Sequence, residues 1–220
     1  MNVRRGDGDG KRTALLVVDM QPDFMPGGAL PVAGGDLLVP PIASLMTSGR
    51  FRRIVATQDW HPRGHVSFAS SHPGTRPFEV VDLYGREQVL WPDHCVQGSP
   101  GAALHQGLPW ALVAAIVRKG ADPDVDSYSG FRNNLDRHGE RPPTGLAGLL
   151  REIGVDHVVL CGLARDYCVK WSAEDAIDAG FRVSVLWDLT RPVDPASDGA
   201  VRAGLERRGV AVSTSDKLHD

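Results

Sequence analysis

One of the three cysteines stands where its thiol could act as a nucleophile. Cys168 lies in the segment CGLARDYCVKWSAEDA, 161–176, which follows an apolar run and leads into a helical pattern. The start of a helix has unpaired N–H groups and a partial positive charge, and both favour a thiolate. Because a free thiol, with a pKa of about 8.5, is mostly protonated at neutral pH, the placement predicts that the helix start activates this sulfur.

Two charged residues are expected beside this thiol. Asp19 closes the apolar run 13–20, and Lys119 ends the run 110–119. If both runs are parallel strands, their carboxyl ends meet at the edge of the sheet where α/β proteins bind ligands. Asp19 could then accept the thiol proton and return it to a leaving amine, while Lys119 adds a positive charge and backbone N–H groups of the turn face a developing oxyanion. Taken singly, the aspartate would more often form a turn, the lysine would more often be solvated, and the cysteine would more often be an inert buried thiol. The prediction of acyl transfer therefore depends on their common position at one edge of the sheet.

A second group of residues could bind a metal ion. Asp59 and His61 are two positions apart in the segment DWH, so in an extended chain their side chains point the same way. His94, in WPDHC, could return from a long loop to complete a set of one carboxylate and two imidazoles, and His65 is a possible fourth ligand. Such a set leaves open positions for water or substrate and suits zinc, iron or manganese. The alternative is a loop that is simply rich in histidine.

The remaining cysteines and histidines are interpreted as structural. Cys161 lies within an apolar run and is expected to be a small core residue. Cys95 follows His94 and could be a ligand, but a packed thiol is the preferred interpretation. The histidines outside the cluster are interpreted as surface or structural residues: His72, His105, His138, His157 and His219.

Apolar runs alternate with helical patterns along the chain. Strands are expected at 13–20, 52–59, 110–119, 156–163, 182–189 and 210–215, although the alanines of 110–119 would also allow a helix. Helices are expected at 36–48, 145–154, 166–179 and 195–209. This alternation predicts right-handed crossovers and an α/β fold with a parallel sheet covered on both sides. Two irregular segments, 60–101 and 120–134, leave the carboxyl ends of expected strands and are interpreted as functional loops.

Length and composition indicate one ordinary domain. The chain has 220 residues, and we expect a single domain over 13–215 between an N-terminal tail, 1–12, and a C-terminal tail, 216–220. The net charge of −3 and the pI of about 6.2 give no sign of a nucleic-acid or membrane-surface partner. The apolar runs are too short to span a bilayer, and no signal peptide is recognised. An odd, low number of cysteines argues against a disulfide framework, so the cytoplasm is the expected location.

Five stretches together resemble the nicotinamidase branch of the isochorismatase-like cysteine hydrolases: LLVVDMQPDFMPGGAL, ATQDWHPRGHVSFAS, WPDHCVQGSPGAALH, VRKGADPDVDSYSGF and GLARDYCV. The match covers the chain from about residue 13 to 192. The resemblance implies a three-layer α/β/α fold with a six-stranded parallel sheet. It also implies hydrolysis of nicotinamide to nicotinate and ammonia through a thioester, as in NAD salvage, with pyrazinamide as a further substrate.

The resemblance implies roles for individual residues of this sequence. The catalytic triad would consist of Asp19, Lys119 and Cys168. The oxyanion hole would be formed by the backbone N–H groups of Ala164 and Cys168, with a cis peptide bond before Ala164. A divalent metal, zinc before iron or manganese, would be held by Asp59, His61 and His94, with His65 a ligand in some relatives. The aromatic ring of the substrate would be lined by Phe24, Trp91 and Tyr128.

One residue departs from the family pattern. Relatives commonly carry threonine where this chain has Arg165, inside the turn before the nucleophile. If this side chain points outward the oxyanion hole is unchanged, whereas pointing inward it could alter substrate choice or add an anion contact. Arg165 therefore keeps open a hydrolase of another amide or carbamoyl compound. Relatives with such substrates generally lack the metal set, which favours a pyridine carboxamide here.

Two questions remain open at this stage. A non-catalytic metal- or ligand-binding protein with an inert Cys168 is the alternative from a different functional class. The sequence does not fix the oligomeric state, and a homo-oligomer is possible.

Overall fold

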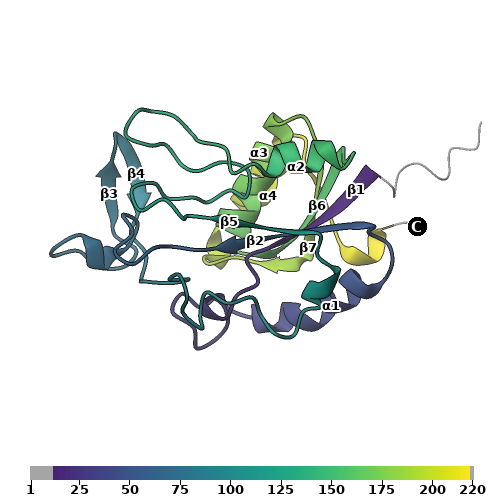
Figure 1. Ribbon diagram of the computed structural model, residues 1–220, viewed down its shortest axis with the longest axis horizontal. Helices are drawn as coiled ribbons and strands as arrows, with labels where there is room; N and C mark the ends of the chain where they lie inside the picture. The colour runs from purple at the N-terminus through teal and green to yellow at the C-terminus, as the bar shows by residue number, and fades with distance from the viewer. Residues whose placement is uncertain (1–11, 219–220) are drawn as a thin grey trace, which may run out of the picture.

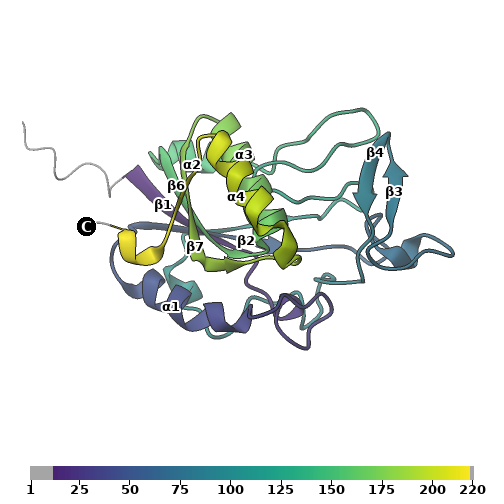
Figure 2. The same cartoon turned by 180° about the vertical axis from the view of Figure 1, so that it is seen from behind.

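A six-stranded parallel sheet forms the centre of the computed structural model, which describes residues 12–218 (Figures 1 and 2). The strand order is β5-β2-β1-β6-β7-β8, and every pairing in this sheet is parallel. The strands are β1 (Thr13–Val18), β2 (Arg53–Asp59), β5 (Ala115–Lys119), β6 (His157–Leu163), β7 (Arg182–Arg191) and β8 (Ala211–Ser213). The expected α/β/α fold with six parallel strands is confirmed.

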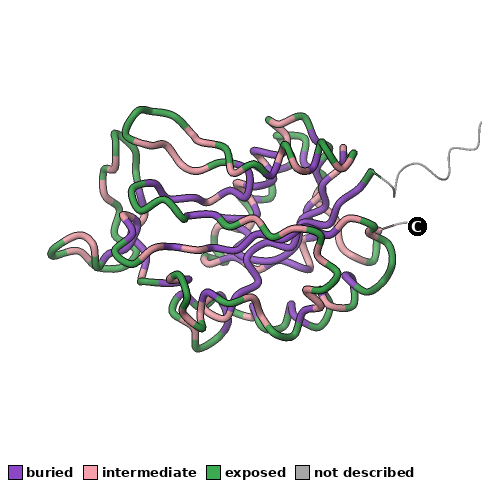
Figure 3. Tube along the Cα trace, in the orientation of Figure 1, coloured by how far each residue is buried: buried purple, intermediate pink, exposed green. Residues whose placement is uncertain are grey.

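Helices cover both faces of this sheet. They are α1 (Val39–Thr47), α2 (Leu146–Glu152), α3 (Lys170–Asp178) and α4 (Asp198–Arg207). Figure 1 shows α1 on one face and α2, α3 and α4 on the other. Because side chains alternate along a strand, Leu15 and Val17 of β1 pack in the core with α1, while Leu16 and Val18 pack in the opposite core. Burial on both faces explains why the sequence of β1 is a continuous apolar run. Figure 3 shows that the central strands form the buried interior of the protein.

Two expected elements differ from the structure. The predicted strand 110–119 begins only at Ala115, because Trp110–Leu112 forms a 3₁₀ turn. The predicted helix 166–179 begins with a π-helical turn, Arg165–Val169, and α3 starts at Lys170. Both differences lie at element ends, where loop contacts rather than periodicity decide the backbone conformation.

The segment 60–101 contains a hairpin that the sequence pattern did not predict. It consists of the antiparallel strands β3 (Val80–Leu83) and β4 (Arg86–Val89), at the carboxyl end of the main sheet (Figure 1). The two residues between the strands, Tyr84 and Gly85, both have positive φ, as tight hairpin turns require. The strands carry several charged residues and are largely exposed, so the alternation of apolar residues is weak.

The ends of the chain are described only in part. The predicted N-terminal tail, apart from residue 12, and residues 219–220 of the predicted C-terminal tail lie outside the described residues. The rest of the C-terminal tail continues a 3₁₀ turn, Ser215–Lys217, whose Ser215 N–H donates to Asp188 at 2.9 Å, and Leu218 packs against the core. Within residues 12–218, no helix is both long enough and apolar enough to cross a bilayer.

Candidate active site

Three charged residues meet at the carboxyl edge of the sheet. Asp19 follows β1, Asp59 ends β2 and Lys119 ends β5. Lys119 Nζ lies 3.0 Å from Asp19 Oδ2 and 2.9 Å from Asp59 Oδ1, and it donates to the Ser127 carbonyl at 3.0 Å. All three charged side chains are buried. The ammonium group of Lys119 has three N–H donors, one for each of its three partners: the two carboxylates and the Ser127 carbonyl. It therefore holds the two carboxylates in fixed positions.

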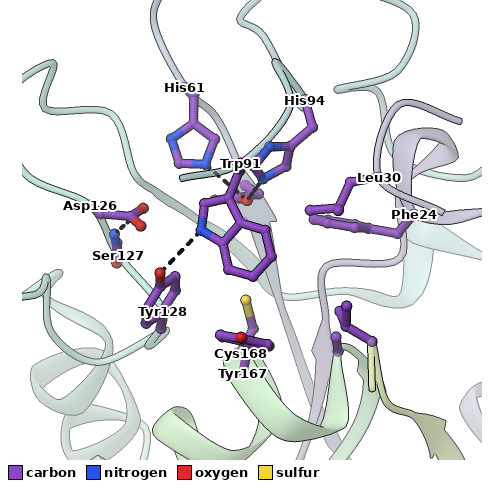
Figure 4. A pocket seen from close by; sticks show the side chains of 13 residues that line it. Phe24, Leu30, His61, Trp91, His94, Asp126, Ser127, Tyr128, Tyr167 and Cys168 are labelled. Atoms are coloured by element: carbon purple, nitrogen blue, oxygen red, sulfur yellow. Dashed lines mark hydrogen bonds and ion pairs between the residues drawn. The ribbon is translucent and has the colours of Figure 1, made fainter. Parts of the chain in front are cut away.

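Cys168 lies beside this group, and its sulfur points into the cavity shown in Figure 4. Asp19 and Lys119 are close enough to the thiol to influence its ionisation. Burial raises the pKa of Cys168 well above its ordinary value, with Lys119 opposing and Asp19 adding to the shift. Burial therefore outweighs the contribution that the helix start and Lys119 make toward a thiolate, and the expected activation of this sulfur stays a prediction. Attack by the sulfur requires a base that removes the proton.

Asp19 has the surroundings of such a base. Thr57 Oγ1 donates to Asp19 Oδ1 at 2.6 Å and accepts a hydrogen bond from the Asp19 backbone N–H at 3.2 Å. Oδ2 accepts no hydrogen bond beyond its ion-pair contact with Lys119. Burial raises the pKa of Asp19 although Lys119 opposes the shift. A carboxylate with a raised pKa, whose Oδ2 contacts only the Lys119 ammonium among the described side chains, is suited to accept a proton.

Asp59, His61 and His94, called here the metal-ligand group, are all buried and each offers one potential ligand atom, and these atoms lie within 4.8 Å of one another. Figure 4 shows the imidazoles of His61 and His94 close together at one end of the cavity. Asp59 Oδ2 lies 3.0 Å from His61 Nε2 and 3.3 Å from His94 Nε2. Ligand atoms about 2.1 Å from a metal stand roughly 3.0–3.4 Å apart at bond angles of 90–109°. The distances from the carboxylate oxygen to the two imidazole nitrogens are therefore those expected between ligands of one divalent ion.

The other nitrogen of each imidazole is held by a backbone carbonyl. His61 Nδ1 lies 3.1 Å from the Gly120 carbonyl, and His94 Nδ1 lies 2.8 Å from the Pro92 carbonyl. A carbonyl can only accept, so both Nδ1 atoms carry hydrogen and both Nε2 atoms can present a lone pair to a metal. Burial alone would raise the pKa of Asp59, but His61 and Lys119 hold it well below its ordinary value, so this ligand is ionised.

Neighbouring backbone positions set this geometry. The Gln21 side chain accepts a hydrogen bond from the Asp59 N–H at 2.7 Å and donates one to the Asp59 carbonyl at 2.8 Å. These two hydrogen bonds fix the backbone of Asp59. Gly120 has φ of +65°, and a Cβ there would lie 2.4 Å from His61 Cε1. Only glycine leaves room for the imidazole at this position.

His65 lies beside the metal-ligand group but has other partners. Its Nδ1 is 2.8 Å from Ser67 Oγ, and its Nε2 is 3.3 Å from the Val125 carbonyl. It also forms a separate set of potential metal ligands with His61 and Asp126. Burial lowers the pKa of His65 to about 4, so the ring is neutral at physiological pH. Ligation of the same ion by His65 would require its carbonyl contact to break and stays a prediction.

Aromatic side chains form the walls of the cavity. Phe24, Trp91 and Tyr128, the three expected ring contacts, all line it, and Trp91 Nε1 donates to the Tyr128 hydroxyl at 3.0 Å. Tyr167 packs edge-on against Trp91, with ring centroids 4.8 Å apart. Together with its open mouth, the cavity has a volume of about 360 Å³.

The turn before Cys168 has the cis peptide bond that the family resemblance implies. The peptide bond between Leu163 and Ala164 is cis, and both Ala164 and Cys168 line the cavity. N–H groups in the first turn of a helix have no partner within the helix, so an oxyanion hole at Ala164 and Cys168 stays a prediction compatible with this turn. Arg165 points outward and contacts β7 and α4 instead of the cavity.

The other two cysteines match their structural interpretation. Cys95 and Cys161 are both buried and free. Burial raises the pKa of each thiol, and neither of these cysteines lines the cavity.

Several residues of the site were not predicted from the sequence. Leu30, Asp126, Ser127, Tyr167 and Val193 line the cavity, and Gln21, Thr57 and Gly120 hold its functional groups. The cavity-lining residues come from loops and strand ends, whose approach depends on tertiary structure. Gln21 and Thr57 gave a weak signal, since both are polar residues at the ends of apolar strands.

Comparison with known proteins assigns the family. The isochorismatase domain family matches residues 13–217. A nicotinamidase of Acinetobacter baylyi is 49% identical over 181 residues, which span 82% of each chain. The structure of PnC1 from L. infantum in complex with nicotinate has a TM-score of 0.81 and 43% identity, with 94% of each chain covered. The structure of the pyrazinamidase of Pyrococcus horikoshii in complex with zinc has a TM-score of 0.74 and 37% identity, with coverage of 92% of this chain and 99% of that one.

The chain therefore belongs to the isochorismatase family. The similarity extends to enzymes over nearly their whole length, and the chain is a hydrolase of this family.

Proposed function

We propose that the protein hydrolyses nicotinamide to nicotinate and ammonia, with Cys168 as nucleophile, and that it also accepts pyrazinamide. The contact of Lys119 with both Asp19 and Asp59 carries this proposal, because it joins the thiol and its base to the metal-ligand group within one cavity. The nicotinamidase and pyrazinamidase relatives, one bound to nicotinate and another to zinc, support the assignment.

The first half-reaction forms a thioester. Asp19 takes the thiol proton while Sγ bonds to the amide carbon, and the electrons of the broken C=O π bond move to oxygen. The N–H groups of Ala164 and Cys168 stabilise this oxyanion. The C–N bond then breaks, the nitrogen takes the proton from Asp19, and ammonia leaves. Lys119 stabilises the carboxylates before and after the transfer.

The second half-reaction releases nicotinate. Asp19 takes a proton from water as the oxygen of that water bonds to the thioester carbon. The S–C bond breaks, and Cys168 regains its proton from Asp19. The raised pKa of both groups makes Asp19 a stronger base and leaves Cys168 protonated at rest, which suits a proton that moves back and forth between them.

The aromatic walls and the metal-ligand group orient the substrate. Phe24, Trp91 and Tyr128 pack against the planar ring. Asp59, His61 and His94 would hold a divalent ion, for which zinc is the first candidate and iron or manganese are alternatives. When bound, such an ion supplies a Lewis-acidic position for a pyridine nitrogen. The substrate would then be fixed at two points, its ring beside the metal-ligand group and its carboxamide beside Cys168.

The product suggests a place in NAD salvage, because nicotinate is a precursor that can re-enter pyridine nucleotide synthesis. A nucleophilic thiol must also remain reduced. The three free cysteines support a reducing compartment, with the cytoplasm as the proposed location.

Ammonia release from nicotinamide by the purified protein tests the activity, with an aliphatic amide as the comparison substrate. Cys168→Ala should lower the rate by more than about 10³-fold, whereas Cys161→Ala, a buried cysteine away from the cavity, should keep it. A Cys168→Ala protein that releases ammonia at a comparable rate would refute the mechanism. A wild type that binds nicotinate without releasing ammonia would identify a binding protein instead.

Metal analysis tests the ligand assignment separately. Asp59→Asn and His61→Ala should each reduce the metal content of the purified protein, measured by mass spectrometry of the element. Unchanged metal content in both variants would remove the assignment of this group.

A further inference from the structure

Arg165 sits inside the nucleophile turn, yet its side chain is directed away from the cavity and is buried. Its Nε donates to Thr190 Oγ1 at 2.8 Å, and its Nη1 donates to Asp198 Oδ2 at 2.6 Å. Its Nη2 donates to the carbonyls of Trp187 at 2.8 Å and Thr190 at 2.6 Å. The guanidinium also lies 3.9 Å from the centre of the Trp187 ring. Because all three nitrogens donate, the side chain is held in one orientation.

The carbonyls that Arg165 binds belong to an irregular part of β7. The register of β7 against β6 shifts between Leu160 and Gly162, so β7 has extra residues at this point. A bulged strand leaves backbone groups without partners in the ladder. The carbonyls of Trp187 and Thr190 accept from Arg165, and the arginine therefore links the bulge to the nucleophile turn.

The next residue forms a second link to the same region. Asp166 accepts from the backbone N–H groups of Val193 and Asp194, both at 2.9 Å. Val193 lines the cavity. Two adjacent side chains of the turn, Arg165 and Asp166, thus hold it to the end of β7 and to the segment that follows.

We propose that Arg165 is a positioning residue for the oxyanion: by anchoring the turn to β7, it fixes where the N–H groups of Ala164 and Cys168 lie relative to the reacting carbonyl. The inference rests on the proposed function. The aromatic ring contacts come mainly from other segments, including Phe24 and Trp91. Loss of Arg165 should therefore lower kcat and leave KM close to its wild-type value.

Arg165→Met and Arg165→Lys test this role. Methionine keeps the apolar stem and removes the donors, whereas lysine keeps the charge but cannot reproduce the fork of contacts. Arg202→Met is the matched control, because Arg202 lies over the same Trp187 ring, at 5.8 Å, but pairs with Glu206 on the exposed surface of α4.

Two quantities are measured per mole of folded protein: the kinetic constants for nicotinamide, and the dissociation constant of its aldehyde analogue, nicotinaldehyde. The thiol adds to this aldehyde by forming an S–C bond as the C=O π bond breaks, and its proton passes to Asp19, so the adduct places an oxyanion in the same hole. Both Arg165 variants should lose about 10- to 100-fold in kcat and a similar factor in aldehyde affinity. Arg202→Met should match the wild type.

Wild-type kcat and aldehyde affinity in Arg165→Met would overturn the proposal even if that variant is less stable, because the arginine would then serve folding alone. If Arg165→Met does not fold, Arg165→Lys decides on the same two readouts, and a wild-type result there overturns it. These outcomes presuppose an active wild type. A wild type that releases no ammonia refutes the proposed function itself, which is a separate result.

Discussion

Thr57→Val offers a quantitative test of how the base is held. Thr57 is completely buried, and its hydroxyl makes two hydrogen bonds to Asp19, at 2.6 Å to the carboxylate and 3.2 Å from the backbone N–H. Valine has nearly the same shape without the hydroxyl. A hydrogen bond to a charged group contributes about 1.5–3 kcal/mol and a neutral one about 1 kcal/mol. Urea unfolding should therefore show a free energy of unfolding lower by about 2–4 kcal/mol.

The same substitution should change the pH dependence of activity. Burial already raises the pKa of Asp19, and the hydrogen bond from Thr57 opposes that shift. Without the hydroxyl the pKa of Asp19 rises further, so a higher pH is needed to ionise the base. The acid limb of kcat/KM for ammonia release should move to higher pH.

Thr57→Ser is the matched control, because serine keeps the hydroxyl and loses only a methyl group. It should retain the wild-type acid limb. Wild-type unfolding free energy together with an unmoved acid limb in Thr57→Val would refute the reasoning about this residue.

Three further predictions concern the surroundings of the site. Burial lowers the pKa of His65 from 6.5 to about 4, so the folded protein favours the neutral ring, and the stability of the fold decreases as the pH falls from 6.5 toward 4. Between pH 7 and pH 5, the free energy of unfolding of the metal-free wild type in urea should therefore fall by about 2 kcal/mol more than that of His65→Gln. Identical losses in the two proteins would contradict this. Burial raises the pKa of Cys168 well above 9.0, so its alkylation by iodoacetamide in metal-free protein should still accelerate at pH 9, and a plateau near neutral pH would show the shift to be wrong. Gly120→Ala should lower metal content because its Cβ would meet His61 at 2.4 Å, whereas Gly139→Ala, which has open space and a similar φ of +77°, should not; equal metal content in the two variants would argue against the steric explanation.

The sheet, and the edge of it where Asp19, Lys119 and Cys168 lie, could be predicted because local signals decided them. The apolar run of β1 is buried on both faces, so its type follows from composition. Asp19 and Lys119 lie at strand ends and Cys168 lies in the turn that follows β6, and parallel strands bring such ends together. The position of these residues therefore follows from the fold class alone, before any contact is known.

Other features depend on contacts that a single segment does not encode. Thr57 faces Asp19 only because β1 and β2 pair in one particular register. The direction of Arg165 depends on the bulge of β7, which is distant in sequence. The high pKa of Cys168 arises from burial among residues of several strands. The hairpin β3–β4 escaped prediction because its strands are short and exposed.

Mass spectrometry of acid-quenched protein would test the central claim most directly. Protein mixed with excess nicotinamide is quenched during turnover, digested and searched for a nicotinoyl group on each cysteine. The proposed chemistry predicts the acyl group on the peptide that contains Cys168, and its absence in Cys168→Ala. Turnover without an acyl group on Cys168, or with the group on another cysteine, would contradict it.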